Sequence, residues 1–179
     1  GGEVGGWAHR SAVAAPRSGS ERRCRESCAE EPRSEPGTPA TDRTVVEKRA
    51  NRMTHLNGGR IVKTYRIALG RGGLGPKMQS GDNRVPEGIY RSTGRNPNSA
   101  YHLSLRISYP SPSQSQAARK RGIDPGGDIM IHGLRNGLGW IGAQHRRIDW
   151  TQGCIAVTNA EIEEIWRTVP DNVVIEIRA

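Results

Sequence analysis

One cysteine of this chain, Cys154, has a setting in which a thiol can act as a nucleophile. It follows Gly153, and glycine permits a tight turn immediately before the sulfur. Such a turn also lets backbone N–H groups approach a substrate carbonyl, where two donors can stabilise the oxyanion formed by thiolate attack. A lone cysteine is more often a small buried hydrophobic residue. The pattern therefore indicates acyl transfer only when a base lies nearby.

A histidine suited to be that base occurs at His132. The run Ile131-His132-Gly133 closes an apolar segment and enters a glycine-rich one, and a histidine at a strand end is well placed to move protons. Without the cysteine, a structural histidine would fit this position equally well. His145 is a rival base because it is closer to Cys154 in sequence. Its polar and basic neighbours favour a solvated surface position instead.

A metal site is the chemical alternative built from the same residue types. His132, His145, Asp149 and Cys154 are ligand types that zinc accepts, but their spacing matches no zinc pattern. We therefore expect no metal and no cofactor.

These residues must be positioned by a domain rich in strands. Alternating or continuous apolar residues predict strands at 44–48, 52–56, 61–69, 88–91, 101–109, 128–132, 154–157 and 173–177. A short polar helix is predicted over 113–121. The clearest helix begins at Thr158, where Glu161 completes the capping-box spacing, and ends before Pro170. Because strands dominate, we expect a β-rich α+β fold with few short helices.

Two glycine-rich segments interrupt the strands. Residues 70–86 and 133–150 are predicted loops, and the second carries Trp140 and Trp150. Long loops inside compact domains are often functional, so both are expected near the chemistry.

Composition divides the chain near residue 42. Residues 1–41 are rich in Gly, Ser, Pro, Arg and Glu without helical or strand period, and we predict a disordered low-complexity tail. Its Cys24 and Cys28 have no second pair at ligand spacing. The tail holds 6 Arg and 6 Glu, so the whole formal net charge of +9 belongs to the predicted domain, residues 42–179.

The positive charge of the domain attracts polyanions, but charge alone does not identify which polyanion is bound. Zinc-finger spacing, an aromatic RNA-binding strand and a basic heptad helix are all missing from the sequence, so nucleic acid is not the expected partner. No apolar run approaches the roughly 20 residues that cross a bilayer. Residues 1–20 also lack the apolar stretch of a secretory signal. We expect no integral membrane segment, and the sequence does not determine the oligomeric state.

Several motifs together resemble the L,D-transpeptidase catalytic domain family of the YkuD type, in its YafK/ErfK-like murein branch. The resemblance covers about residues 42–179. It is carried by the following residues: Ile131-His132-Gly133, Thr151-Gln152-Gly153-Cys154, Asn159, Gly75-Pro76-Lys77, Gly81-Asp82 and Pro86-Glu87-Gly88-Ile89-Tyr90. Gln152 and Ala156 stand where many members have a His and an Arg.

The resemblance implies a β-sandwich-like catalytic domain that forms a thioester on Cys154. His132 would take the thiol proton, and the backbone carbonyl of Gly133 would orient its ring. Backbone N–H groups of Gly153 and Cys154 would hold the oxyanion, and Thr151 matches the Ser or Thr of the family motif.

The resemblance also implies the biological setting. The substrates would be peptidoglycan stem peptides, used in cell-wall cross-linking or remodelling and so in cell shape. Trp140, Asp149 and Asn159 are candidate substrate-binding residues. The expected location is the cell envelope or periplasm.

Three other functions remain open on the sequence. The same Cys–His pair would act as an L,D-carboxypeptidase or endopeptidase if water replaced the acceptor amine. A non-catalytic wall-binding module would not need Cys154. A nucleic-acid binder would bind in a strongly salt-dependent manner, whatever residue stood at 154.

Overall fold

The computed structural model describes residues 40–179. The predicted tail, with Cys24 and Cys28, lies outside the described residues except for its last two positions. Of these, Thr41 is buried, and its N–H donates to the carbonyl of Thr168 at 2.9 Å. Thr41 therefore packs against the domain that follows it.

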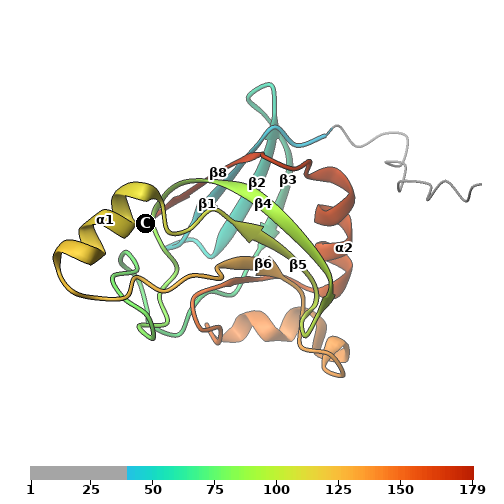
Figure 1. Ribbon diagram of the computed structural model, residues 1–179. Helices are drawn as coiled ribbons and strands as arrows, with labels where there is room; N and C mark the ends of the chain where they lie inside the picture. Colours follow the sequence, from blue (N-terminus) through green and yellow to red (C-terminus); the bar gives the residue numbers. More distant parts are fainter. Residues whose placement is uncertain (1–39) are drawn as a thin grey trace, which may run out of the picture. The chain divides into compact units, whose positions relative to one another are not determined.

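The described chain is mostly β-sheet with three helices (Figure 1). In chain order the elements are β1 (Arg43–Glu47), β2 (Arg52–Asn57), β3 (Arg60–Arg66), β4 (Gly88–Ser99), β5 (His102–Ile107), α1 (Pro112–Lys120), β6 (Met130–His132), the 3₁₀ helix η1 (Gly139–Arg147), β7 (Ile155–Ala156), α2 (Asn159–Thr168) and β8 (Val174–Arg178). Helices α1 and α2 lie at opposite ends of the strands (Figure 1).

One long strand, β4, joins two groups of strands. The strand order is β3-β2-β1-β8-β4-β5-β6-β7. Residues 88–91 of β4 pair with β8, whereas residues 92–99 pair with β5. The register shifts between Ser92 and Gly94, where β4 passes from one group to the other. This arrangement confirms the predicted β-rich, sandwich-like fold class.

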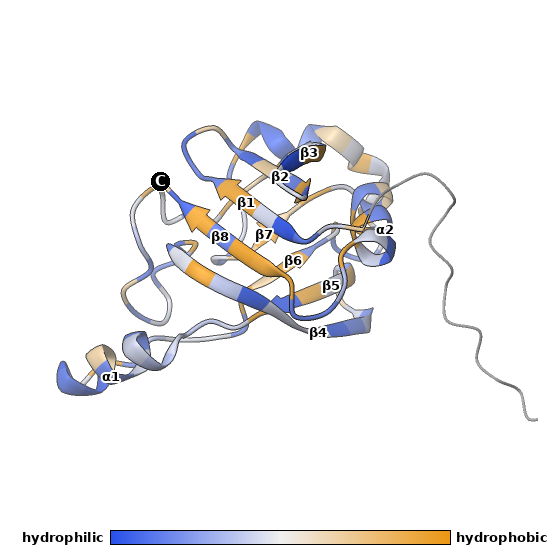
Figure 2. Ribbon diagram, turned by 90° about the horizontal axis from the view of Figure 1, so that it is seen from above, coloured by the Kyte–Doolittle hydropathy of each residue, from blue (hydrophilic) through white to orange (hydrophobic). Residues whose placement is uncertain are grey.

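The hydrophobic core lies between the strands and α2. Strands β1 and β8 carry hydrophobic residues along the middle of the domain (Figure 2). Helix α2 contributes Ile162 and Ile165, which lie three residues apart on one face and are both fully buried. Its predicted capping box is confirmed: Thr158 Oγ1 accepts from the Glu161 N–H, and the Glu161 carboxylate accepts from the Thr158 N–H. In residues 40–179 no helix is long and apolar enough to cross a membrane.

Three segments differ most from the sequence prediction. The predicted strand 61–69 ends at Arg66, because the following residues leave β2 and bridge to the β7 region instead, at Ala68–Ala156. Strand β4 runs eight residues beyond Arg91, through a polar stretch without apolar alternation. The predicted loop 133–150 contains η1.

Candidate active site

A cavity of about 530 Å³ opens beside β6 and β7, and it contains both residues of the predicted catalytic pair. Cys154 and His132 line it together. Residues on its wall also include Arg71, Lys77, Asn83, Asn96, Ser99, Tyr101, Ser104, Asp128, Met130, Trp150, Thr151 and Gln152. Segments far apart in sequence therefore meet at one site.

The ring of His132 is held at the end of β6 in a defined tautomer. Its Nδ1 lies 2.7 Å from the carbonyl oxygen of Gly133. A carbonyl oxygen can only accept, so Nδ1 carries the hydrogen and Nε2 keeps a free lone pair. The rings of Tyr101 and Trp150 lie against the imidazole, with centroids 4.6 and 5.8 Å away. The arrangement leaves Nε2 as the basic nitrogen.

Burial keeps this imidazole neutral. His132 is only 4% exposed, and burial lowers its pKa below the ordinary value, although the hydrogen bond to Gly133 acts in the opposite direction. A histidine with a lowered pKa is unprotonated at neutral pH and can accept a proton.

The loop after His132 is held by the start of α2. Asn159 Oδ1 accepts from the N–H of Leu134 at 2.8 Å. A Cβ at Gly133 would lie 2.8 Å from the same Asn159 oxygen, so only glycine fits this approach. The predicted substrate-binding residue Asn159 thus has an observed role in fixing the carbonyl that orients His132, and contact with substrate stays a prediction.

The turn before Cys154 depends on Gly153 and Thr151. Gly153 has φ +121°, and a Cβ there would lie 2.8 Å from the Arg84 carbonyl oxygen. Thr151 Oγ1 accepts from the Gly153 N–H at 3.2 Å and donates to the Cys154 carbonyl at 2.7 Å. The Gly153 N–H, a predicted oxyanion donor, is therefore engaged inside the turn. The β6–β7 pairing starts at Ile155, one residue after Cys154, so the Cys154 N–H is not part of that pairing.

The thiol of Cys154 is protonated at rest. Burial raises its pKa, opposed by a backbone hydrogen bond with Met130 and by the positive charge of Lys77. Sγ lies 3.6 Å from the carbonyl oxygen of Asp128. A neutral thiol and a neutral imidazole that line one cavity favour proton transfer during attack over a preformed ion pair.

The remaining predicted residues lie around this pair. Asp149 Oδ1 accepts from the Leu69 N–H at 2.7 Å and from Asn51 Nδ2 at 2.9 Å, so it anchors the turn that precedes Cys154. Trp140 is 82% exposed on η1 and does not line the cavity. A role in substrate binding stays a prediction for both Asp149 and Trp140.

The surface position expected for His145 is wrong. This residue is 7% exposed, because η1 folds it under the ring of Trp150, whose Nε1 donates to His145 Nδ1 at 3.4 Å. Burial lowers the pKa of His145 to about 4. It does not line the cavity that holds Cys154.

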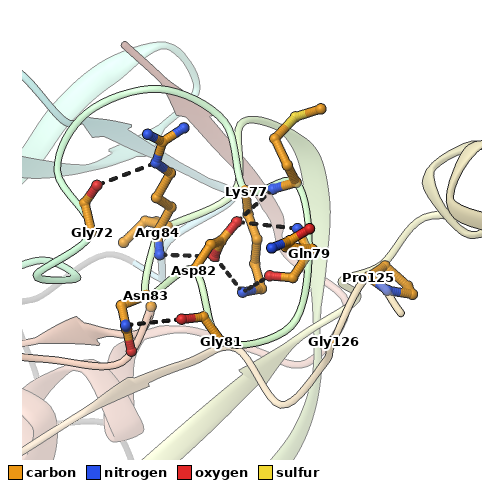
Figure 3. A network of polar contacts seen from close by, with 12 residues as sticks. Gly72, Lys77, Gln79, Gly81, Asp82, Asn83, Arg84, Pro125 and Gly126 are labelled. Carbon is orange, nitrogen blue, oxygen red and sulfur yellow. Dashed lines mark hydrogen bonds and ion pairs between the residues drawn. The ribbon is translucent and has the colours of Figure 1, made fainter. Parts of the chain in front are cut away.

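An ion pair shapes the loop 70–86 that forms one wall of the cavity (Figure 3). Asp82 Oδ1 lies 2.8 Å from Lys77 Nζ, and the Asp82 carboxylate also accepts from the N–H groups of Met78, Gln79 and Arg84. Burial raises the pKa of Asp82, but these contacts outweigh it and hold the pKa at about 2. Asp82 therefore organises the loop in its ionised form.

We expect Asp82→Asn to lower the free energy of unfolding by about 3 kcal/mol, because it leaves the buried Lys77 charge unpaired. Urea unfolding at pH 7 measures this. Asp171→Asn is the matched control: Asp171 pairs with Arg95 at the surface and should change stability by about 0.5 kcal/mol or less. Equal losses in the two variants would contradict a structural role for Asp82.

Sequence reasoning did not single out several cavity residues. Tyr101, Ser104 and Arg71 carry no motif signal, and only the fold brings them beside the catalytic pair. Lys77 belongs to the Gly75-Pro76-Lys77 motif, but its pairing with Asp82 could not be read from it. Among residues 40–179, no group of three or more His, Cys, Asp or Glu side chains is arranged to hold a metal ion.

The family model of the L,D-transpeptidase catalytic domain, YkuD, matches residues 41–177. The chain belongs to this family. This L,D-transpeptidase domain is 34% identical to YafK of Escherichia coli (strain K12) over 112 residues. The aligned segment covers 61% of this chain and 37% of YafK. The chain thus spans little more than a third of that relative.

Solved structures share the fold of this L,D-transpeptidase domain. The helical cell shape determining protein Pgp2 from Campylobacter jejuni matches with a TM-score of 0.58 and 22% identity, over 78% of this chain and 48% of that one. The L,D-transpeptidase from Xylanimonas cellulosilytica matches with a TM-score of 0.52 and 13% identity, over 81% and 63% of the two chains.

Proposed function

We propose that this domain is a peptidoglycan L,D-transpeptidase that works through a thioester on Cys154. The observation that carries the proposal is one cavity lined by both the protonated thiol of Cys154 and the neutral, carbonyl-oriented imidazole of His132. Membership of the family supports the reaction class.

The first half-reaction transfers an acyl group to sulfur. Sγ bonds to the donor carbonyl carbon while its proton passes to His132 Nε2. The tetrahedral intermediate then collapses, the C–N bond breaks, and the Nε2 proton passes to the leaving nitrogen. The products are a thioester on Cys154 and a free amine, which is D-alanine when the donor is a stem tetrapeptide.

The second half-reaction resolves the thioester. An acceptor amine attacks the carbonyl carbon and gives a proton to Nε2, the C–S bond breaks, and the proton returns to sulfur. Water in place of the amine would make the same residues a hydrolase. A backbone N–H at Cys154 is the proposed oxyanion donor in both steps, because it precedes the strand pairing.

The charge of the cavity suits an anionic peptide. Lys77 pairs with Asp82, and Asp128 pairs with Arg106. Arg71 is exposed on the cavity wall and forms no ion pair with an acidic side chain of residues 40–179. Stem peptides end in carboxylates, which a guanidinium binds well. We therefore assign Arg71 to the carboxylate of the donor.

We expect Arg71→Gln to raise KM for a stem tetrapeptide by about 10-fold, because one charge-assisted contact is lost. Steady-state release of D-alanine measures it. Arg60→Gln, which removes an exposed arginine from β3 away from the cavity, should leave KM unchanged. With a donor whose C-terminus is amidated, the wild type and Arg71→Gln should have the same KM. An unchanged KM in Arg71→Gln would exclude this role.

The cellular setting belongs to the same proposal. A transpeptidase of this kind would act on the wall in the envelope or periplasm, in cross-linking or remodelling. Structural likeness to a helical cell shape determining protein is compatible with a part in cell shape.

Product analysis of the wild-type protein tests the proposed function. The protein is incubated with a stem tetrapeptide, with and without a second stem peptide as acceptor amine, and the products are identified by mass spectrometry. A cross-linked product supports the transpeptidase, and a tripeptide formed by water alone supports the hydrolase. Absence of both, and of any acyl-enzyme, would leave the wall-binding module as the better explanation.

A further inference from the structure

One buried hydroxyl in the cavity wall has no partner. Ser104 is 1% exposed, and its Oγ makes no hydrogen bond within residues 40–179. Ser104 nevertheless lines the cavity that holds Cys154 and His132. Buried polar groups are nearly always hydrogen-bonded, so an unpaired one in a reaction cavity points to a group that arrives with the substrate.

The other buried hydroxyls of this cavity are already engaged. Ser99 Oγ accepts from the Tyr101 N–H at 3.1 Å. Thr151 Oγ1 holds the turn before Cys154. Ser104 is therefore the buried hydroxyl of the cavity wall that stays free to bind substrate.

The sheet places Ser104 beside the catalytic base. In the antiparallel pair β5–β6, Ser104 stands directly opposite His132. Residues opposite each other in such a pair project from the same face, with Cβ atoms about 4.5–5.5 Å apart. The next residue, Leu105, points into the core and is fully buried, as strand alternation requires.

The proposed reaction creates a matching need at this position. The nitrogen of the scissile amide must lie near His132 Nε2, because Nε2 gives it a proton. The Nε2–H of His132 then donates to the lone pair of the amide nitrogen. The hydrogen that the amide nitrogen already carries needs a different acceptor in this largely buried site. An acceptor amine in the second half-reaction likewise carries one N–H more than His132 can take.

We propose that Ser104 Oγ accepts a hydrogen bond from the reacting nitrogen of the substrate, first on the donor amide and then on the acceptor amine. This inference rests on the proposed function. The contact orients the nitrogen lone pair toward His132 during departure and toward the thioester during attack. Ser104 is thus a substrate-binding residue at the reacting atoms.

A carbapenem tests this role because its lactam nitrogen carries no hydrogen. We expect Ser104→Ala to lower kcat/KM for stem-tetrapeptide acylation by about 10- to 100-fold, the loss of one hydrogen bond at the reacting centre. Acylation by the carbapenem should stay within about twofold of wild type, since the nitrogen has no N–H to offer. Stopped-flow or timed intact-mass measurements give both rates.

Thermal unfolding separates binding from structural support. Removing an unpaired buried hydroxyl should leave Tm unchanged or raise it by up to about 4 °C. Ser92→Ala is the matched control on β4: the Ser92 hydroxyl donates to Pro170 O and accepts from the Val173 N–H, away from the cavity. That variant should lower Tm and leave both acylation rates unchanged.

The outcomes are distinct. Equal losses toward peptide and carbapenem, or a fall of Tm like that of Ser92→Ala, would mean that Ser104 supports the fold or the position of His132, and would overturn the inference. Unchanged peptide acylation would overturn it as well. A wild-type protein that forms no adduct with either reagent would remove the proposed function itself.

Discussion

Replacement of Cys154 by Ala is expected to abolish the acyl-enzyme and to lower turnover of a stem tetrapeptide by at least about 10⁴-fold, because the sulfur is the proposed nucleophile. The fold should persist, since the turn is held by Thr151 and Gly153 and not by the thiol. Intact-mass spectrometry with a stem tetrapeptide and with a carbapenem measures the adduct. Wild type should gain one acyl group, and Cys154→Ala none.

The tail thiols provide an internal control for this experiment. Cys24 and Cys28 are present in both proteins, so any nonspecific acylation of thiols should be equal in the two. Peptide mapping locates the adduct. A covalent adduct of normal yield in Cys154→Ala would contradict the thioester mechanism and direct attention to other nucleophiles.

Loss of the base is expected to be almost as severe. We expect His132→Gln to reduce the acylation rate by about 10²- to 10⁴-fold, the range for a general base. Glutamine occupies a similar volume but cannot take the thiol proton at neutral pH. His102→Asn is the control, because His102 lies outside the cavity and asparagine tolerates its left-handed backbone, φ 68°. Equal rates in His132→Gln and wild type would exclude His132 as the base.

The pH profile of acylation should report the same residue. Burial lowers the pKa of His132, so its protonated and inactive form accumulates only below pH 6.5, the ordinary value. The rate should therefore fall with decreasing pH along a limb centred below 6.5. Burial raises the pKa of Cys154 above 9.0, so a change caused by thiol ionisation should appear only in the alkaline range. An acid limb centred above pH 6.5 would contradict this environment for His132.

Local sequence patterns were sufficient for elements whose determinants are close in the chain. The capping box of α2 needs only Thr158 and Glu161, three residues apart, and the apolar spacing that follows buries Ile162 and Ile165. Alternation likewise indicated most strands. Residue types also sufficed to predict that Cys154 is paired with a histidine at the end of a strand.

Other features depend on contacts between distant residues. The polar second half of β4 is a strand because β5 pairs with it. Its sequence has no alternation of apolar residues from which that pairing could be predicted. His145 appeared solvated from its basic neighbours, but η1 turns it beneath Trp150. In both cases tertiary packing outweighed the local pattern.

The sequence by itself determined the family, the β-rich class, the main helix, and a cysteine and a histidine as candidates for the chemistry. Tertiary structure decided what surrounds them. The tautomer of His132 follows from one carbonyl oxygen, the ionised loop anchor from the Lys77–Asp82 pair, and the unpaired hydroxyl of Ser104 from its register opposite His132. The physical reason is that a pKa, a tautomer or an unmet hydrogen bond depends on which atoms lie within a few ångströms, and strand pairing sets those neighbours.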